Sequence, residues 1–368
     1  MKRANAILAV AGAGVLVAAA WFLASGQGPA GERARGSAVL PDLEKRAGEV
    51  ASIEIARGSA TVRLENRKDV GWSIATSDGY PARTELVRAL VASLGGLAIE
   101  DKMTAKPERH KELALAWPDA EGRARLVRFL PTEAPGAQPV AELVVGEERF
   151  SPDAVFVRLP GQDQTWRARG RVQIPDDAMG WMDRSLVVLP SDETLSVEFD
   201  GLVLSRPTDA TPAADAAARR PWEAKIDEAE RARWTDAQQE SAKLGLPSFL
   251  ERLEFEAVRR ARGDVAKEPK WTAVFDLKTG TLTLAGHEEP EGVWFTLTAF
   301  PKPDAPKAAP PGQEGDPYVP DWSAFAARTA GWEYRVPAWR ADTLRRMRQA
   351  PAADPAAAQT DQGSQNQP

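Results

Sequence analysis

The chain has 368 residues, of which 43% are hydrophobic and 27% charged, and its net charge is −6. This length favours two domains over one core, and the acidic balance argues against nucleic acid as a partner because the chain as a whole has no basic footprint. Cysteine is absent, which excludes disulfides, thiolate catalysis and cysteine-ligated metals.

The N-terminus carries an apolar stretch long enough to span a membrane. Lys2 and Arg3 precede residues 4–24, which contain no charged residue and would form a helix of roughly 30 Å, the thickness of a bilayer core. Residues 1–24 therefore predict a transmembrane anchor. The alternative is a cleaved signal peptide, since Ala24-Ser25-Gly26 offers small residues for cleavage. Both interpretations place the body outside the cytoplasm, and the basic start predicts a single-pass inner-membrane protein with a cytoplasmic N-terminus and a periplasmic body.

The segments on either side of the predicted lobes are expected to lack regular secondary structure. Residues 25–48 are rich in Gly, Ala and Arg and predict a tether between the membrane and the folded body. Residues 349–368 contain no aromatic or large aliphatic residue and predict a disordered tail. Surface loops are expected at 206–221 and in the proline-dense stretch 301–320.

The first half alternates like half-buried strands and then turns helical. Strands are predicted at 52–55, 62–64 and 72–74, a helix at 84–94, and further strands at 143–146 and 155–159. The second half repeats this order, with strands at 195–199, 202–204, 282–286 and 293–297, and a long charged helix over 227–253, broken near Gly245-Leu246-Pro247. The fold class expected is α+β, with two related lobes of mainly antiparallel strands at 49–190 and 191–348, each with a packed helix.

Candidate chemistry is sparse. His110 and His287 are the only histidines and lack metal-ligand spacing, so two solvated surface histidines are expected. No serine nucleophile elbow or phosphate-binding loop occurs in the sequence. The neighbouring acids are interpreted as solvated turn and helix-start residues rather than a catalytic pair; they are Glu147-Glu148, Asp176-Asp177, Asp192-Glu193 and Glu288-Glu289. No catalytic, cofactor-binding or metal-binding residue is predicted, and no cofactor.

Four of the twelve tryptophans occupy matching places in the two halves: Trp72 matches Trp222, and Trp181 matches Trp339. Matching places in a duplication favour packing over ligand binding, so these four are expected to be core anchors. The basic cluster at Arg345, Arg346 and Arg348 suits a helix C-terminus.

The strand motifs carry a family resemblance. An Ile-x-Ile strand at 53–55 is followed by Val-x-Leu at 62–64 and Trp-x-Ile at 72–74, all behind one membrane span. In this order the chain resembles the domain-of-unknown-function family numbered 4340, over Val50 to Leu344. The resemblance implies an extracytoplasmic accessory role beside ABC transporter components of the gliding-motility type. Its motifs are packing patterns, so no functional residue carries over.

The leading hypothesis is therefore a non-enzymatic, membrane-tethered interaction protein linked to an ABC-type transport system. The alternative is an envelope protein that binds or processes glycans. A groove with tryptophan rings and converging carboxylates would favour glycan, whereas exposed apolar side chains would favour a protein partner.

Overall fold

The computed structural model describes residues 34–132, 138–190, 192–206, 221–228, 230–263, 269–305 and 320–348. The predicted anchor at 1–24 and the predicted tail at 349–368 lie outside these ranges. Within them, none of the helices combines the length and apolar character needed to cross a bilayer. The chain divides into two compact units, Met1–Met182 and Asp183–Pro368.

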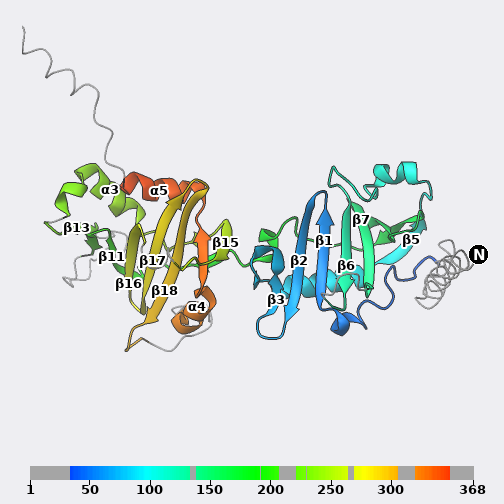
Figure 1. Ribbon diagram of the computed structural model, residues 1–368, viewed down its shortest axis with the longest axis horizontal. Coiled ribbons are helices and arrows are strands. Elements are labelled where there is room, and N and C mark those ends of the chain that lie inside the picture. The colour runs from blue at the N-terminus through cyan, green and yellow to red at the C-terminus, as the bar shows by residue number, and fades with distance from the viewer. Residues whose placement is uncertain are drawn as a thin grey trace, which may run out of the picture. The chain divides into compact units, whose positions relative to one another are not determined.

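Unit 1 is built around a nine-stranded antiparallel sheet with the order β4-β3-β2-β1-β6-β7-β8-β9-β5 (Figure 1). Its elements are η1 (Ala47–Glu49), β1 (Ser52–Arg57), β2 (Ala60–Arg67), β3 (Gly71–Ile74), η2 (Ala75–Ser77), β4 (Tyr80–Pro81), α2 (Thr84–Gly95), β5 (Ala98–Lys102), η3 (Pro107–Leu113), β6 (Arg125–Leu130), β7 (Ala141–Phe150), β8 (Asp153–Arg158), β9 (Thr165–Arg169) and η4 (Met179–Trp181).

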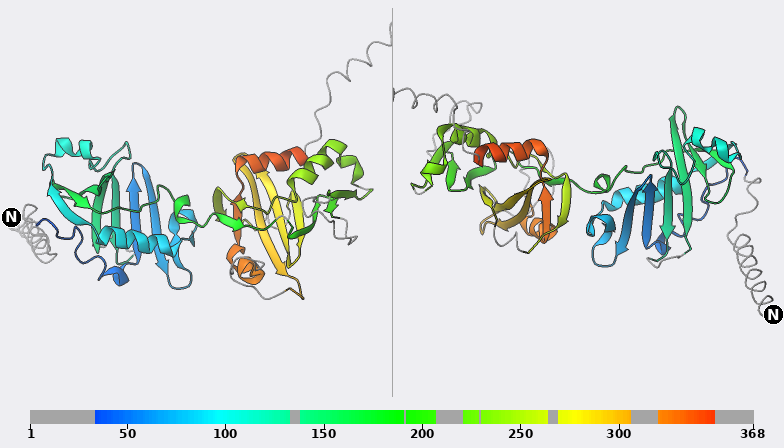
Figure 2. Two further views of the ribbon diagram at one scale, coloured as in Figure 1. Left: turned by 180° about the vertical axis from the view of Figure 1, so that it is seen from behind. Right: turned by 45° about the horizontal axis from the view of Figure 1, so that its top comes forward.

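Alternation of apolar and polar residues decides which face of this sheet is buried. Ile53 of β1 pairs with Leu64 of β2, and both side chains are fully buried. Helix α2 lies across the sheet (Figure 2) and buries Val87, Leu90 and Leu94. The predicted helix at 84–94 is thereby confirmed, and so is the α+β class, because both units consist mainly of antiparallel strands with packed helices.

The predicted tether is wrong over its second part. The Gly36 N–H donates to the Ile99 carbonyl at 2.7 Å and the Val39 N–H to the Leu97 carbonyl at 2.8 Å. Val39 and Leu43 are buried. This lead-in segment is part of unit 1 because it satisfies the backbone groups on the outer edge of β5, which would otherwise stay unpaired.

Unit 2 contains an eight-stranded antiparallel sheet with the order β13-β12-β11-β16-β17-β18-β19-β15. Its elements are β10 (Ser185–Val187), β11 (Thr194–Phe199), β12 (Leu202–Ser205), β13 (Glu223–Ile226), η5 (Arg231–Arg233), α3 (Asp236–Gly245), β14 (Leu253–Glu254), β15 (Ala257–Arg260), β16 (Trp271–Leu277), β17 (Gly280–Glu289), β18 (Gly292–Pro301), α4 (Trp322–Thr329), β19 (Trp332–Arg335) and α5 (Ala338–Arg348). Helices α3 and α5 lie side by side at one end of the strands, and α4 lies at the other (Figures 1 and 2).

The long helix predicted over 227–253 is wrong. Helix α3 begins after Thr235, whose side chain and Gln238 form a capping box, and it ends at Gly245. The chain leaves the helix after Gly245 because Pro247 has no N–H to donate to the Lys243 carbonyl and its ring would clash there. Leu246, Phe249 and Leu250 are then buried outside the helix. The predicted break near Gly245 is confirmed.

The two sheets have corresponding strand orders. Reading β3, β2, β1, β6, β7, β8, β9 and β5 of unit 1 against β13, β12, β11, β16, β17, β18, β19 and β15 of unit 2 gives the same succession. In unit 2 as well, a lead-in segment pairs with the chain entering the edge strand, since β10 pairs with β14 and the Phe255 N–H donates to the Arg184 carbonyl. This pairing assigns residues 183–190 to unit 2, whereas the sequence placed them in the first lobe.

The glycines and tryptophans that correspond in the two halves of the sequence have different surroundings in the two units. Gly146 lies in β7 where the register with β8 shifts, whereas Gly286 lies in the regular ladder of β17 and β18, where a Cβ would overlap the Trp271 ring. Trp181 is fully buried in η4, but Trp339 is 63% exposed on α5. The prediction that Trp339 is a core anchor is therefore wrong, and Trp72 and Trp222 are only half-buried.

A turn before β6 is held by one carboxylate. Asp119 accepts hydrogen bonds from the backbone N–H groups of Ala124 at 2.8 Å, Arg123 at 2.7 Å and Glu121 at 3.0 Å. These bonds, the one from Ala124 most of all, lower the pKa of Asp119 below its ordinary value, because they favour the charged form.

Asp119→Asn is expected to lower the unfolding free energy of unit 1 by about 1 kcal/mol at pH 7. The folded pKa lies below the unfolded one of about 3.9, so the contribution is present above the unfolded pKa and is lost as pH falls through the folded pKa. The gap between wild type and variant should therefore close as the pH falls below the unfolded pKa and through the folded one. Denaturant titrations at several pH values measure it, with Asp69→Asn, exposed in the turn after β2, as the control. A gap that does not change with pH would contradict this assignment.

Candidate functional site

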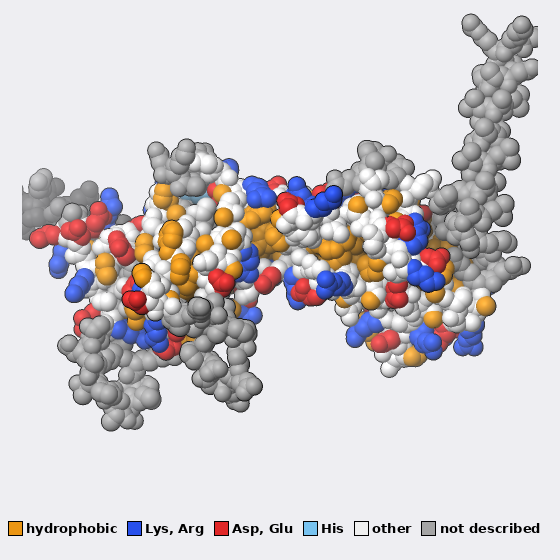
Figure 3. All heavy atoms as spheres, turned by 90° about the horizontal axis from the view of Figure 1, so that it is seen from below, with side chains coloured by type: hydrophobic (Ala, Val, Ile, Leu, Met, Phe, Trp, Pro, Cys, Tyr) orange, Lys and Arg blue, Asp and Glu red, His pale blue; other side chains and the backbone are white. Residues whose placement is uncertain are grey.

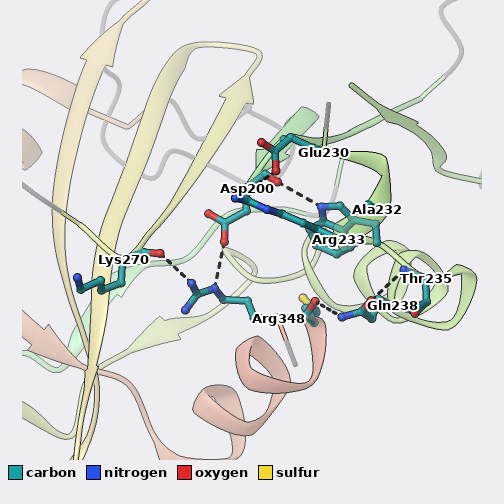
Figure 4. Close-up of a pocket in the computed structure, with 11 residues that line it drawn as sticks. Asp200, Glu230, Ala232, Arg233, Thr235, Gln238, Lys270 and Arg348 are labelled. Atoms are coloured by element: carbon teal, nitrogen blue, oxygen red, sulfur yellow. Dashed lines mark hydrogen bonds and ion pairs between the residues drawn. The ribbon is translucent and has the colours of Figure 1, made fainter. Parts of the chain in front are cut away.

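A pocket of about 730 Å³ opens in unit 2 where a hairpin, the start of α3 and the last turn of α5 meet (Figure 4). Eleven residues line it: Asp200, Gly201, Glu230, Ala232, Arg233, Trp234, Thr235, Gln238, Lys270, Met347 and Arg348. This volume falls within the range of small-molecule sites.

The hairpin wall depends on a two-residue turn. Asp200 and Gly201 connect β11 to β12 with φ values of 46° and 80°, and Asp-Gly is the pair that such left-handed hairpin turns favour. A Cβ at position 201 would come within 2.7 Å of the Glu230 side chain. The absence of a side chain at Gly201 therefore lets the loop carrying Glu230 approach the turn.

The other wall is fixed by hydrogen bonds from Trp234 and α3. The Trp234 indole N–H donates to the Asp200 carbonyl at 3.2 Å. Gln238, which is buried, donates to the Met347 carbonyl at 3.2 Å and accepts from the Thr235 N–H at 2.9 Å. These bonds join three elements that are distant in the sequence, so the pocket is preorganised.

Each acid of the pocket already has basic partners. The Asp200 carboxylate accepts from the Arg348 Nε at 3.0 Å and from the Thr272 N–H at 3.2 Å, and Glu230 lies 2.7 Å from Arg233. Arg348 also donates to the Lys270 carbonyl at 2.8 Å, while the Lys270 ammonium points away from the other residues drawn in Figure 4. Two carboxylates and three cationic residues therefore line the pocket, which offers both donors and acceptors to a ligand.

A second polar cluster surrounds His287 on the other side of unit 2's sheet from the apolar residues Leu284 and Phe295. The Glu289 carboxylate receives the Arg259 guanidinium through two bonds of 2.6 and 3.0 Å and lies 2.8 Å from His287 Nε2. Arg262 also pairs with Glu289. Glu333, which is fully buried, accepts from Arg259 Nε at 2.8 Å. The cluster connects β15, β17 and β19.

The expectation of solvated histidines is wrong for both. His287 is only 7% exposed and His110 only 4%; His110 Nε2 lies 2.8 Å from the Asp163 carbonyl. Both are buried because each finds polar partners contributed by distant strands and loops, which sequence spacing does not reveal. In the described ranges no group of three or more metal-capable side chains is placed to hold a metal.

The predicted acid pairs do not converge. Glu147 and Glu148 lie on β7, and Glu288 and Glu289 lie on β17. Asp176 pairs with Arg57 at 2.7 Å. A hydrogen bond from Lys278 lowers the pKa of Asp192. Two of these acids depart from the expected solvated position. The side chain of Glu193 is 12% exposed beside Lys278, and that of Glu289 is 16% exposed within the His287 cluster.

Large apolar side chains are exposed on the helix pair of unit 2. Leu244 of α3 is 82% exposed and Trp339 of α5 is 63% exposed. A Cβ at Gly245 would approach the Thr343 methyl at 3.0 Å, and the Thr343 hydroxyl donates to the Trp339 carbonyl one turn away. Leu244 is therefore next to the residue at which α3 meets α5, and Trp339 lies one turn before Thr343 on α5.

Comparison with known protein families gives one match, which covers the middle of the chain. A family model described as Domain of unknown function (DUF4340) matches residues 72–272, more than half of the 368-residue chain. The chain belongs to the DUF4340 family. The match runs from β3 to β16, so it crosses the boundary between the two units. It is narrower than the Val50–Leu344 range expected from the strand motifs.

Neither the curated proteins nor the solved structures contain a match to the chain. The DUF4340 description assigns no residue role, so the site rests on its own geometry. Within the pocket, the matched range includes Asp200 and Glu230 but not Arg348. One signal for the pocket is present in the sequence, the Asp200-Gly201 dipeptide between two apolar runs. The pairing of Asp200 with Arg348 has no sequence signature.

Proposed function

We propose that this DUF4340 protein is a membrane-tethered, extracytoplasmic and non-enzymatic interaction protein that serves an ABC-type transport system as an accessory subunit. The uncharged stretch 4–24 after Lys2 and Arg3 supports the tether and the address. The corresponding strand orders of the two sheets support an origin by duplication. The observation that carries the interaction role is the exposed pair Leu244 and Trp339.

Exposed tryptophan in a fixed position is typical of protein-binding hot spots. Arg340, itself buried, lies 4.5 Å from the Trp339 ring centroid and donates to the Arg252 carbonyl. Trp339 is therefore held against a fixed base, which reduces the entropy lost when a partner binds.

Charge patterning also favours a protein partner over nucleic acid. On the face shown in Figure 3, acidic and basic side chains are interspersed on both units rather than gathered by sign. An enzymatic role finds less support, because the carboxylates of the pocket are engaged by arginines.

The test is affinity capture of the tagged full-length protein from membranes in mild detergent. We expect wild-type protein to capture ABC-type transporter subunits. The double variant Leu244→Ser, Trp339→Ser should capture at least tenfold less of them, because truncating a hot-spot residue costs about 2 kcal/mol or more of binding free energy. Phe300→Ser is the matched control, since Phe300 is a 61% exposed residue on β18 of the same unit. Equal capture by the double variant, or capture without transporter subunits, would contradict the proposal.

A further inference from the structure

We infer that the outer face of unit 2's sheet, centred on Thr283, is a contact surface between two copies of this chain. The outer face is the side of the sheet opposite the buried residues Leu284 and Phe295. The inference goes beyond the proposed function and does not depend on it. Leu244 and Trp339 lie on α3 and α5, whose buried side chains pack on the opposite side of the sheet.

Strand register defines the outer face of unit 2. Its centre consists of six uncharged side chains in two rows that cross β16, β17 and β18: Val274, Thr283 and Thr298, then Thr272, Ala285 and Thr296. Along each strand these residues alternate with buried ones, and all six are at least partly exposed. Five of the six are β-branched, so their side chains are stiff and lose little rotamer freedom when a partner covers them.

The corresponding face of unit 1 carries a row of paired charges instead. Glu54 of β1 lies 3.2 Å from Arg63 of β2, and Arg128 of β6 lies 3.5 Å from Glu142 of β7. The four residues are direct neighbours across β2, β1, β6 and β7. Charged side chains on a sheet face remain hydrated and oppose contact with another sheet. The two units therefore differ in charge on the same face.

Unit 1 also covers the apolar part of its outer face with its own chain. The connection from β5 to β6 and the sheet together form one apolar cluster: Leu115, Ala124, Leu126, Val144 and Phe156. At Gly146 of β7 a Cβ would overlap the Leu113 carbonyl, so this connection rests directly on the strand. It spans residues 103–124, whereas the connection from β15 to β16 spans only residues 261–270. The described residues of unit 2 accordingly leave the centre of its outer face open to a partner.

Shape and charge both favour a second copy as that partner. Sheets with small side chains stack face to face about 10 Å apart, and a two-fold axis pairs such a face with itself. The chain's net charge of −6 opposes the approach of two copies through charged surfaces. The centre around Thr283 carries no like-charge cost, and depletion of charge is typical of the core of an interface.

The first test uses the absence of cysteine from the chain. A single cysteine replaces Thr283 in the full-length protein, and membranes are treated with a bismaleimide that spans about 10 Å, the distance between stacked sheets. We expect a covalent homodimer, identified by mass spectrometry. Thr61→Cys is the matched control, since Thr61 is an exposed threonine on β2 of unit 1, and it should give no homodimer.

The second test places a charge at the centre of the face. Thr283→Lys is expected to weaken self-association of the full-length protein in lipid nanodiscs roughly tenfold or more, because like charges meet across the two-fold axis. Thr61→Lys should self-associate as wild type does. Thr283 is partly exposed, so the variant is expected to fold, and circular dichroism checks this. Both lysine variants should still capture transporter subunits, which separates this inference from the proposed function.

Four outcomes would overturn the inference. They are the absence of a homodimer from the cysteine at position 283, an equal homodimer yield from position 61, crosslinking of position 283 to a different protein alone, and self-association that Thr283→Lys leaves unchanged.

Discussion

Trp271→Ala is expected to lower the unfolding free energy of unit 2 by about 3–5 kcal/mol. Trp271 begins β16, is 3% exposed, packs 6.1 Å from the Phe199 ring and lies over Gly286, where no Cβ would fit. Removing the indole leaves a cavity on the sheet face over Gly286 and beside Phe199, which the closely packed surroundings fill poorly. Amide hydrogen exchange of peptides from β16 to β18, followed by mass spectrometry, measures this loss of stability in unit 2 separately from unit 1.

Trp339→Ala is the matched control for Trp271→Ala, because the same residue is removed from the same unit. Its side chain is 63% exposed, so little apolar burial is lost and the change should stay within about 0.5 kcal/mol. Equal exchange rates in the Trp271→Ala and Trp339→Ala variants would refute the assignment of Trp271 to the core.

Glu333→Gln is expected to destabilise unit 2 by roughly 2–3 kcal/mol. The carboxylate is fully buried and accepts from Arg259 Nε at 2.8 Å and from the Arg262 N–H at 3.1 Å. Neutralising it leaves Arg259, which stacks 3.7 Å from the Trp294 ring centroid, with Glu289 as its main counter-charge. The loss of unfolding free energy should be smaller than the loss on breaking an isolated buried ion pair, because Glu289 still binds Arg259 through two hydrogen bonds.

Exchange in β15 and β19 should rise first in Glu333→Gln, since the cluster joins these strands. Glu240→Gln provides the comparison: Glu240 is 67% exposed and pairs with Lys243 at 2.7 Å, and an exposed pair contributes about 0–1 kcal/mol. Faster exchange confined to α3 in both variants would show that the buried cluster does not hold the edge strand.

The sequence predicted well what local patterning controls. Period-two alternation placed β1, β2, β11 and β12, and the helical pattern over 84–94 placed α2. The shared order of motifs anticipated the corresponding strand orders of the two sheets. These features depend on neighbours within a few residues or on repetition, and both can be read from one sequence.

What the sequence missed depends on contacts between distant segments. His287 is buried beside Glu289 of its own strand and beside Arg259. Arg259 is 28 residues away in the sequence, and a partner at that distance leaves no periodic trace. Trp339 is exposed because α5 turns it away from the core, a matter of helix orientation. The pocket escaped prediction for the same reason, since Asp200 and Arg348 are 148 residues apart.

Photo-crosslinking in living cells tests whether the surface at Leu244 contacts an ABC-type transporter subunit. A photoreactive amino acid replaces Leu244 in the full-length protein, and a second strain carries it in place of Phe300, which is equally suited to surface substitution. We expect a light-dependent adduct with an ABC-type transporter subunit from position 244 and none from position 300. No adduct from position 244, the same adduct from both positions, or adducts with cytoplasmic proteins alone would contradict it.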